Sequence, residues 1–186
     1  MSRECHIWYE EGNPTASAKV YQMIKIQPAS LDLAKSYNLA VKSVSAEGKF
    51  LSGTSGFPID STVEFIQEII DNNWSQFYAV EGDRVVGWCD IIPRKQEFFA
   101  HVGILGMGVI KEFRGQGIGK KLLETALIDA QTKGIEKVEL EVYASNIPAQ
   151  NLYRKFGFEV EGVKKKSKKT QGEYEDVIIM GLWLKE

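Results

Sequence analysis

The stretch that decides the fold lies in the second half of the chain and reads Val109-Ile110-Lys111-Glu112-Phe113-Arg114-Gly115-Gln116-Gly117-Ile118-Gly119-Lys120-Lys121. An apolar run from His101 to Ile110 ends inside it. A helical pattern then begins at Ile118, because apolar residues recur with the spacing of one helix face at Leu122, Leu123, Ala126, Leu127 and Ala130. Gly134 occupies the position of a helix C-cap. The stretch therefore predicts a strand, a glycine-rich turn and a helix.

Three glycines of this turn, Gly115, Gly117 and Gly119, are expected around the start of the helix. There the free backbone N–H groups point outward, and the helix dipole adds partial positive charge. Glycine has no Cβ, so a ligand can approach these N–H groups closely. We therefore predict a phosphate or pyrophosphate site over residues 114–120, which we call the anion cradle. Positive charge around it comes from Lys111, Arg114, Lys120 and Lys121.

Two better-known glycine-rich loops do not fit these residues. A P-loop has Gly, four residues and then Gly-Lys-Ser/Thr, but Arg114 stands where its first glycine belongs and Lys121 where its hydroxyl belongs. A dinucleotide-binding fingerprint needs a glycine at the position of Lys120. For the hexapeptide from Arg114 to Gly119 taken alone, a helix start with incidental glycines is the competing interpretation.

The sequence after Gly134 supplies a second strand and a second helix. Val138, Leu140 and Val142 alternate with glutamates, as in a strand with one apolar face. A turn over residues 145–149 then leads into a helix with a proline in its first turn. The apolar positions of this helix follow helical spacing at Ala149, Leu152, Tyr153 and Phe156, and Gly157 ends it.

Together these two segments resemble the GNAT acetyltransferase superfamily. Arg114-Gly115-Gln116-Gly117-Ile118-Gly119 matches its Arg/Gln-x-x-Gly-x-Gly/Ala signature, and Asn146-x-x-Ala149-x-x-x-Tyr153-x-x-x-Gly157-Phe158 matches its second signature at the usual distance. The resemblance covers residues 85–184 well and the first half only in the order of its elements. It implies a mixed α/β (α+β) fold, in which a mostly antiparallel sheet of about six to seven strands contains a splayed parallel pair and is flanked by about four helices.

The same resemblance implies acetyl-CoA as the cofactor and assigns residues to it. Its pyrophosphate would lie over the anion cradle, and its pantetheine arm would lie in a gap beside the strand that precedes the cradle. A bulge, marked by Gly103, Gly106 and Gly108, would open this gap. Backbone groups of Val109 and Lys111 would pair with the pantetheine amides. The implied cofactor-binding residues are Val109, Ile110, Lys111, Arg114, Gly115, Gln116, Gly117, Ile118, Gly119, Lys120, Asn146 and Tyr153.

Acetyl transfer to an amine sets three tasks for the site. The amine is mostly protonated at neutral pH and must lose a proton, the tetrahedral intermediate needs hydrogen-bond donors, and the departing thiolate leaves more readily when it is protonated. By resemblance, Tyr153 supplies that last proton; the alternative is a tyrosine that only packs in the core. Asn146 either contacts the cofactor or only caps the helix.

A general base is harder to assign. Glu97 and His101 stand at the start of the expected long strand, Glu97 to Ile110, where the family often places an acid or a water-relaying residue. His101 also titrates in a useful range. Both are catalytic candidates, and Asp90 is a weaker third. The alternatives are that they are ordinary strand-edge residues and that water removes the proton.

The first half of the chain is expected to build the acceptor side. A strand over Val20–Gln27 precedes a helix from Ser30 to about Val44, and a glycine-punctuated loop runs from Ala46 to Ile59. A second helix is expected to start at Ser61, where Glu64 would complete a capping box. Residues 76–80 and 85–92 then form a hairpin. In the loop, Phe50, Leu51 and Phe57 either contact the acceptor, by resemblance, or only anchor the loop.

The C-terminal part contains a run of five lysines between Lys164 and Lys169 and a final strand over Glu175–Leu184. The lysine run could attract an acidic acceptor or RNA. It could equally be a solvated hairpin, which the formal net charge of −2 favours. By resemblance, Glu173 and Tyr174 help to shape the acceptor site.

Length and composition bound the remaining choices. With 186 residues and 44% hydrophobic content, we expect a single domain over residues 19–186 after an irregular arm over residues 1–18. Two cysteines and two histidines indicate neither a disulfide framework nor a zinc site, so we expect no metal. No apolar run reaches the ~18 residues that span a membrane, and no signal-peptide core is present, so a cytoplasmic protein is expected. The arm could pack on the domain or on a second copy, which leaves a homodimer open.

The predicted function is therefore an N-acetyltransferase. It would move acetyl from acetyl-CoA directly to a primary amine of a small molecule, an amino acid or a polyamine-like compound. One alternative is a protein N-terminal acetyltransferase of the ribosomal-protein type. The other is a non-catalytic acyl-CoA-binding module. Neither a membrane nor nucleic acid is expected as a partner.

Overall fold

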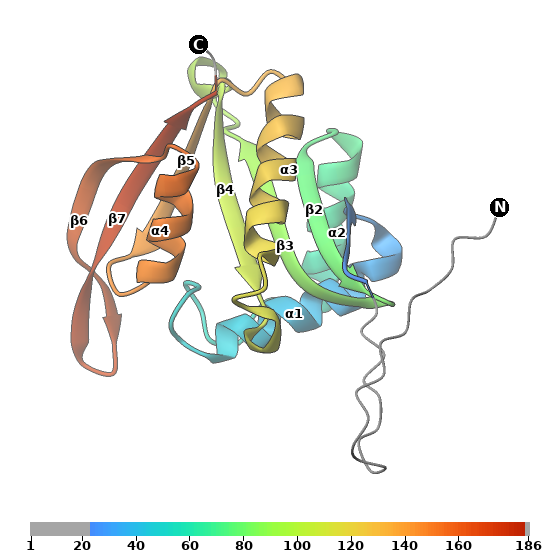
Figure 1. Cartoon of the computed structure of the whole chain (residues 1–186), viewed down its shortest axis with the longest axis horizontal. Helices are drawn as coiled ribbons and strands as arrows, with labels where there is room; N and C mark the ends of the chain where they lie inside the picture. Colours follow the sequence, from blue (N-terminus) through green and yellow to red (C-terminus); the bar gives the residue numbers. More distant parts are fainter. Residues whose placement is uncertain (1–22, 185–186) are drawn as a thin grey trace, which may run out of the picture.

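The computed structural model describes residues 23–184, which form a twisted seven-stranded sheet with α-helices on both faces (Figure 1). The sheet order is β1-β2-β3-β4-β5-β7-β6, and only the β4–β5 pair is parallel within this described part. The strands are β1 (Lys25–Pro28), β2 (Ser75–Glu81), β3 (Arg84–Pro93), β4 (Val102–Val109), β5 (Lys137–Tyr143), β6 (Glu159–Thr170) and β7 (Glu173–Trp183). The helices are α1 (Ala34–Ala46), α2 (Ile59–Asp71), α3 (Ile118–Thr132) and α4 (Ile147–Lys155). The predicted fold class is confirmed.

Helices α3 and α4 cover one face of the sheet, and α1 and α2 lie on the other (Figure 1). On the α3 side, the helix packs closely because Gly87 of β3 leaves room for the Leu122 side chain. On the α1 side, the Tyr37 ring stacks on Tyr78 at 4.9 Å between centroids and meets Trp88 edge-on at 5.8 Å. Burial of these apolar side chains on both faces makes one continuous core through β2, β3 and β4.

Strands β4 and β5 separate after a short region of contact. Their backbone pairing is limited to Val102–Ile104 with Lys137–Glu139, so the rest of β4 diverges from β5. The predicted bulge in β4 is wrong, because β3 and β4 pair in unbroken register from Gly87–Val109 to Pro93–Gly103. The glycines of β4 instead allow close approach: a Cβ at Gly108 would lie 2.3 Å from the Trp88 ring and one at Gly106 2.7 Å from Asp90 Oδ2. The predicted splay itself is present.

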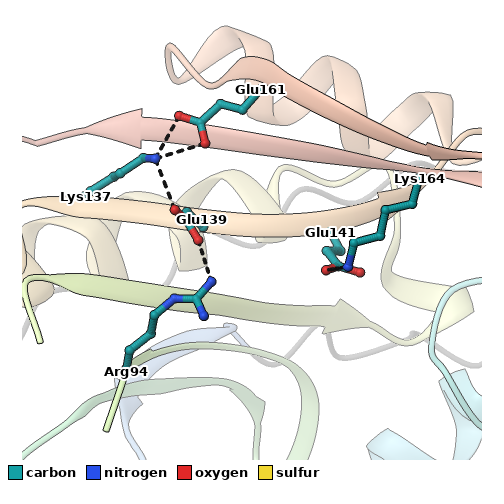
Figure 2. Close-up of polar contacts among 6 residues, drawn as sticks. All are labelled: Arg94, Lys137, Glu139, Glu141, Glu161 and Lys164. Carbon is teal, nitrogen blue, oxygen red and sulfur yellow. Dashed lines mark hydrogen bonds and ion pairs between the residues drawn. The ribbon is translucent and has the colours of Figure 1, made fainter. Parts of the chain in front are cut away.

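Side-chain ion pairs connect the sheet across the point where β4 and β5 meet (Figure 2). Arg94, directly after β3, pairs with Glu139 of β5 at 2.7 Å, and Lys137 of β5 contacts both Glu139 at 3.0 Å and Glu161 of β6 at 2.9 Å. These pairs reach from the end of β3 across β4 to β5, and from β5 across β7 to β6. A separate pair, Glu141 with Lys164, lies further along β5.

Several predicted boundaries are wrong. The strand expected from Glu97 begins only at Val102, because residues 97–99 form a 3₁₀ turn. Helix α2 begins at Ile59 rather than Ser61, so no capping box forms there; Pro58 is the N-cap, and the Thr62 hydroxyl donates to its carbonyl at 3.0 Å. The arm and the start of the first expected strand lie outside the described residues. Among the residues that are described, no helix is long and apolar enough to cross a membrane.

Candidate active site

A cleft of about 630 Å³ occupies the gap between β4 and β5. Its walls are β4 from Leu105 to Val109, β5 from Glu141 to Tyr143, the anion cradle and the first turns of α4. Because the two strands no longer pair here, their inward-facing backbone groups border the cleft instead of each other. This is the gap that the sequence predicts for a pantetheine arm.

The anion cradle has the backbone geometry that its glycines predict. Gly115 and Gly117 adopt left-handed φ values of 76° and 78°, and a Cβ at either would meet no atom within 4 Å. Gly117 is the N-cap of α3 and makes no side-chain capping hydrogen bond. The first N–H groups of α3 therefore face the open space above the cradle, where an anion would be stabilised.

Most of the predicted cofactor residues line this cleft. Val109, Arg114, Gly115, Gly117, Ile118, Gly119, Lys120, Asn146 and Tyr153 do so. Three do not: Ile110 is buried in the core and its N–H donates to Val86 O, Lys111 is exposed in a 3₁₀ turn, and the Gln116 amide donates to Glu112 O. Contact of their side chains with a cofactor stays a prediction that this geometry does not support.

Arg114 acts differently from the free cation that the sequence suggests. Its guanidinium donates to both carboxylate oxygens of Glu47, at 2.8 Å and 2.5 Å, and to Val109 O at 2.8 Å. It also lies 4.7 Å from the centroid of the Phe50 ring. The Arg114 hydrogen bonds lower the pKa of Glu47, so the pair is ionised at neutral pH. Arg114 thus fastens the loop after α1 to the cradle, and Lys120 is the second cradle cation that lines the cleft.

Tyr153 of α4 is buried and lines the cleft next to Asn146. Burial raises the pKa of its phenol, so the hydroxyl remains protonated and can donate. Its ring packs against Phe158 at 5.6 Å, so Tyr153 both packs in the core and borders the cleft, and its role as proton donor stays a prediction. Asn146 caps α4 by accepting from the Ala149 N–H at 3.3 Å and also borders the cleft.

Neither predicted base lies at the cleft. Glu97 is exposed in the 3₁₀ turn before β4, and His101 stacks on Trp183 with 6.5 Å between ring centroids. Both precede β4, whereas the cleft borders β4 only from Leu105 onward. A strand advances about 3.3 Å per residue, so His101 is roughly 13 Å of chain from the nearest lining residue. The sequence placed both residues at the start of a strand, but β4 begins later than its apolar pattern suggests.

Asp90, the weaker candidate, is the acid that the structure brings close to the cleft. It is 9% exposed and pairs in register with Gly106, a lining residue of the cleft. Burial raises the pKa of its carboxyl to about 7, although the side chain of Gln76 opposes part of this rise. Gln76 is itself buried and accepts from the Tyr78 hydroxyl at 3.2 Å. A carboxyl held near its midpoint at neutral pH can both take up and release a proton.

Asp90 also borders a second cavity, of about 380 Å³, between β3 and the α1–α2 segment. We call it the side cavity. Leu51 lines both the side cavity and the cleft, so the two spaces are neighbours. The residues around the side cavity are Tyr37, Val41, Leu51, Phe57, Ser61, Thr62, Phe65, Trp88 and Asp90.

The predicted acceptor contacts are found in part. Leu51 and Phe57 line the side cavity, and Phe50 lines the cleft. Sequence reasoning missed Tyr37, Val41 and Trp88, although Tyr37 and Val41 are one helical turn apart in a segment recognised as a helix. Glu173 and Tyr174 border neither space, since they stand exposed at the turn between β6 and β7.

The lysine run lies within β6 rather than in a hairpin loop, whose turn is at Gln171 and Gly172. Lys165 pairs with Asp176 at 2.9 Å and Lys168 with Glu175 at 3.0 Å, and Lys164 pairs with Glu141. Lys168 and Lys169 also lie over the rings of Tyr143 and Tyr174. These partners account for four of the five lysines locally, which supports the solvated-surface interpretation.

Comparison with known proteins agrees with this architecture. The acetyltransferase (GNAT) family model matches residues 46–158. The L-amino acid N-acetyltransferase AaaT of Escherichia coli (strain K12) is 28% identical over 144 residues, 76% of this chain and 88% of that protein. A ribosomal protein bS18-alanine N-acetyltransferase of Salmonella typhimurium is 34% identical over 118 residues, 59% of this chain and 80% of that protein.

Among solved structures, a GNAT superfamily phosphinothricin acetyltransferase from Sinorhizobium meliloti, in complex with AcCoA, superimposes with a TM-score of 0.81. The match covers 86% of this chain and 88% of that one at 18% identity, so it bears on the fold alone. The family match extends over more than half of the chain and includes the cradle, Tyr153 and most residues that line the cleft. The chain belongs to the GNAT family of acetyl-CoA-dependent N-acetyltransferases.

Proposed function

We propose that this protein transfers acetyl from acetyl-CoA to the primary amine of a small molecule. The observation that carries the proposal is that three features lie along one cleft. The cradle offers free N–H groups at one end, the gap between β4 and β5 exposes backbone groups in the middle, and Tyr153 lines the wall. A separate cavity opens beside the cleft for the second substrate.

The residues of the cleft fit a nucleotide-linked thioester. Two left-handed glycines and the start of α3 leave room for a pyrophosphate, and Lys120 adds positive charge beside it. When bound, acetyl-CoA supplies an acetyl group activated as a thioester. The chain's own part is to hold that cofactor along β4, exclude water with Leu105, Leu152 and Val177, and move protons.

Two buried acids are suited to the proton transfers. Asp90 is proposed to accept the proton of the acceptor ammonium, since its raised pKa of about 7 matches the working range of a general base. Tyr153 is proposed to protonate the departing thiolate, since burial keeps its phenol neutral. Glu97 and His101 do not border the cleft and have no part in this proposal.

A protein N-terminus is the second candidate acceptor. The similarity to a ribosomal protein bS18-alanine N-acetyltransferase favours it. The side cavity is also open at its rim, where Phe57 is 61% exposed. A non-catalytic acyl-CoA-binding module would need neither buried acid, so retention of both argues for an enzyme.

The test is release of free thiol from acetyl-CoA in the presence of primary amines and of peptides with free N-termini. The proposal expects turnover with small amines and slower or no turnover with peptides. Tight acetyl-CoA binding without thiol release for any acceptor would instead identify a binding module. Preference for a peptide over every small amine would select the second candidate.

A further inference from the structure

The side cavity has a mostly apolar lining. Six of its nine lining residues present aromatic or aliphatic surface: Tyr37, Val41, Leu51, Phe57, Phe65 and Trp88. Its volume of about 380 Å³ lies within the roughly 300–1,000 Å³ that small-molecule sites occupy. Water in such a space would find few hydrogen-bond partners along most of the wall, so an apolar group is the favoured occupant.

Charge in the side cavity is limited to one end. Asp90 is the one charged side chain among the described residues that line it, and the other polar groups are the Ser61 and Thr62 hydroxyls and the Tyr37 phenol. Thr62 already accepts from the Asn38 amide at 2.7 Å and donates to Pro58 O, so it is committed to holding α1, α2 and the loop together. A ligand therefore meets a single anionic partner.

The charged end adjoins the place where chemistry would occur. The carboxyl of Asp90 lies so close to Gly106 that any Cβ there would touch it, and Gly106 borders the cofactor cleft. Gly108, the next residue on that face, likewise leaves the Trp88 ring against the cleft wall. The apolar wall runs from this end to Phe57 at the exposed rim.

From this arrangement we infer that the acceptor is a primary amine carrying one bulky apolar group, such as an arylalkylamine. Its nitrogen lies at Asp90 and its apolar group fills the side cavity. This inference rests on the proposed function and narrows its substrate class. A polyamine would leave its second ammonium without a carboxylate in the cavity. A free amino acid would place its carboxylate in the side cavity, where the described lining residues include no Lys or Arg to pair with it.

The experiment compares kcat/KM for 2-phenylethylamine, ethylamine, spermidine, L-phenylalanine and an alanine-initiated peptide, with acetyl-CoA saturating. We expect 2-phenylethylamine to exceed ethylamine by more than about 10-fold, because even one methylene in a hydrophobic pocket gives about 10- to 200-fold. It should also exceed spermidine and L-phenylalanine. Turnover led by any of the other four overturns the inference but leaves acetyl transfer intact. No thiol release with any acceptor refutes the proposed function itself.

Variants test whether the side cavity causes the selectivity. Val41→Phe places extra volume in the cavity and should reduce the ratio of 2-phenylethylamine to ethylamine about tenfold or more. Leu39→Phe is the matched control, because Leu39 is on the same helix but is 67% exposed and borders neither space. Calorimetric affinity for acetyl-CoA should be equal in both variants.

A milder variant covers the case in which Val41→Phe unfolds. Phe57→Ala removes an exposed side chain at the rim of the side cavity, and it should lower the ratio of kcat/KM for 2-phenylethylamine to that for ethylamine several-fold. If the ratio of the two amines stays at the wild-type value in Phe57→Ala and in a folded Val41→Phe, the apolar group binds elsewhere and the inference is wrong.

Discussion

At the scale of single residues, the proposed site contains two acids whose pKa values rise for the same reason and with different results. Burial disfavours the charged form of both Tyr153 and Asp90. For the phenol, this removes ionisation from the working range and preserves a proton donor. For the carboxyl, it moves ionisation into the working range, to about pH 7, and creates a group that can exchange protons.

Tyr153→Phe should separate chemistry from binding. The ring and its packing against Phe158 remain, and only the phenol proton is lost. General-acid catalysis contributes about 10²–10⁴ in rate, so kcat should fall by that factor while calorimetric acetyl-CoA affinity stays constant. Because burial raises the pKa of Tyr153 above its usual value, wild-type activity should show no loss from its ionisation below pH 10. Wild-type kcat in the variant would make Tyr153 a packing residue.

Asp90→Asn should stabilise the fold while impairing catalysis. In wild type, the folded-state carboxyl binds a proton up to about pH 7, whereas the unfolded-state carboxyl loses it near pH ~3.9. Stability from this group therefore falls as pH rises between these values and stays low above them, by on the order of 4 kcal/mol at most. Asn carries no charge at any pH. In calorimetric melting, the Tm of the variant should lie several degrees above that of wild type at pH 8. At pH 4 the two Tm values should be almost equal. Equal melting of both proteins at pH 8 would show that Asp90 is not strained by burial.

At the scale of elements, the turn before α3 combines two requirements that one residue type meets. Its chain reversal uses left-handed backbone at Gly115 and Gly117, and its proposed binding of an anion would use the open space that a missing Cβ leaves. The turn and the start of α3 could be predicted from the glycine spacing because their backbone requirement is local to the hexapeptide, whereas the anion site itself stays a prediction.

Gly117→Asp should abolish acetyl-CoA binding while the fold survives. A carboxylate at the N-terminus of α3 would occupy the anion site and repel a pyrophosphate. Gly134→Asp is the control, since Gly134 has a similar left-handed φ of 87° with no atom near its Cβ position, but at the other end of α3. Calorimetry should detect acetyl-CoA binding to the control and none to Gly117→Asp. Unchanged affinity in Gly117→Asp would contradict the anion-cradle assignment.

At the scale of the whole molecule, the sequence could predict features that depend on residues close together in the chain, but not features that depend on residues far apart. The fold class, the cradle, the hairpin of β2 and β3, and Asn146 as a cap follow from motifs and periodicity within short windows. The start of β4 and the position of Glu97 did not, since an apolar run cannot show where a strand yields to a 3₁₀ turn. The side cavity needs Tyr37, Trp88 and Asp90 brought together from α1 and β3, which only tertiary packing accomplishes. The Arg114–Glu47 pair, 67 residues apart, has no local signal at all.

The lysines of β6 should matter for solubility and not for turnover. β6 is an edge strand of the sheet, and charged edges discourage pairing with other chains. Changing Lys165, Lys166 and Lys169 to Ala should leave kcat/KM for a small amine within about twofold, because none of these lysines lines the cleft and surface charges are screened beyond ~8 Å at physiological salt. The variant should aggregate at lower protein concentration in light scattering. A large, salt-dependent rise in acceptor KM would instead indicate an acidic acceptor.

The limited contact between β4 and β5 has a mechanical consequence. The two halves of the sheet, β1–β4 on one side and β5, β7 and β6 on the other, are joined by three paired backbone positions and by the Arg94–Glu139 ion pair, and the cofactor cleft lies between them. Gly108 lies about 13 Å along β4 from Ile104, the last residue paired with β5. A rotation of β4 by only ~5° about Ile104 would therefore change the width of the cleft at Gly108 by about 1 Å. Ions at high salt weaken the charged part of the joint but not its backbone part. We therefore expect the short region of contact between β4 and β5 to limit how far the cleft can widen.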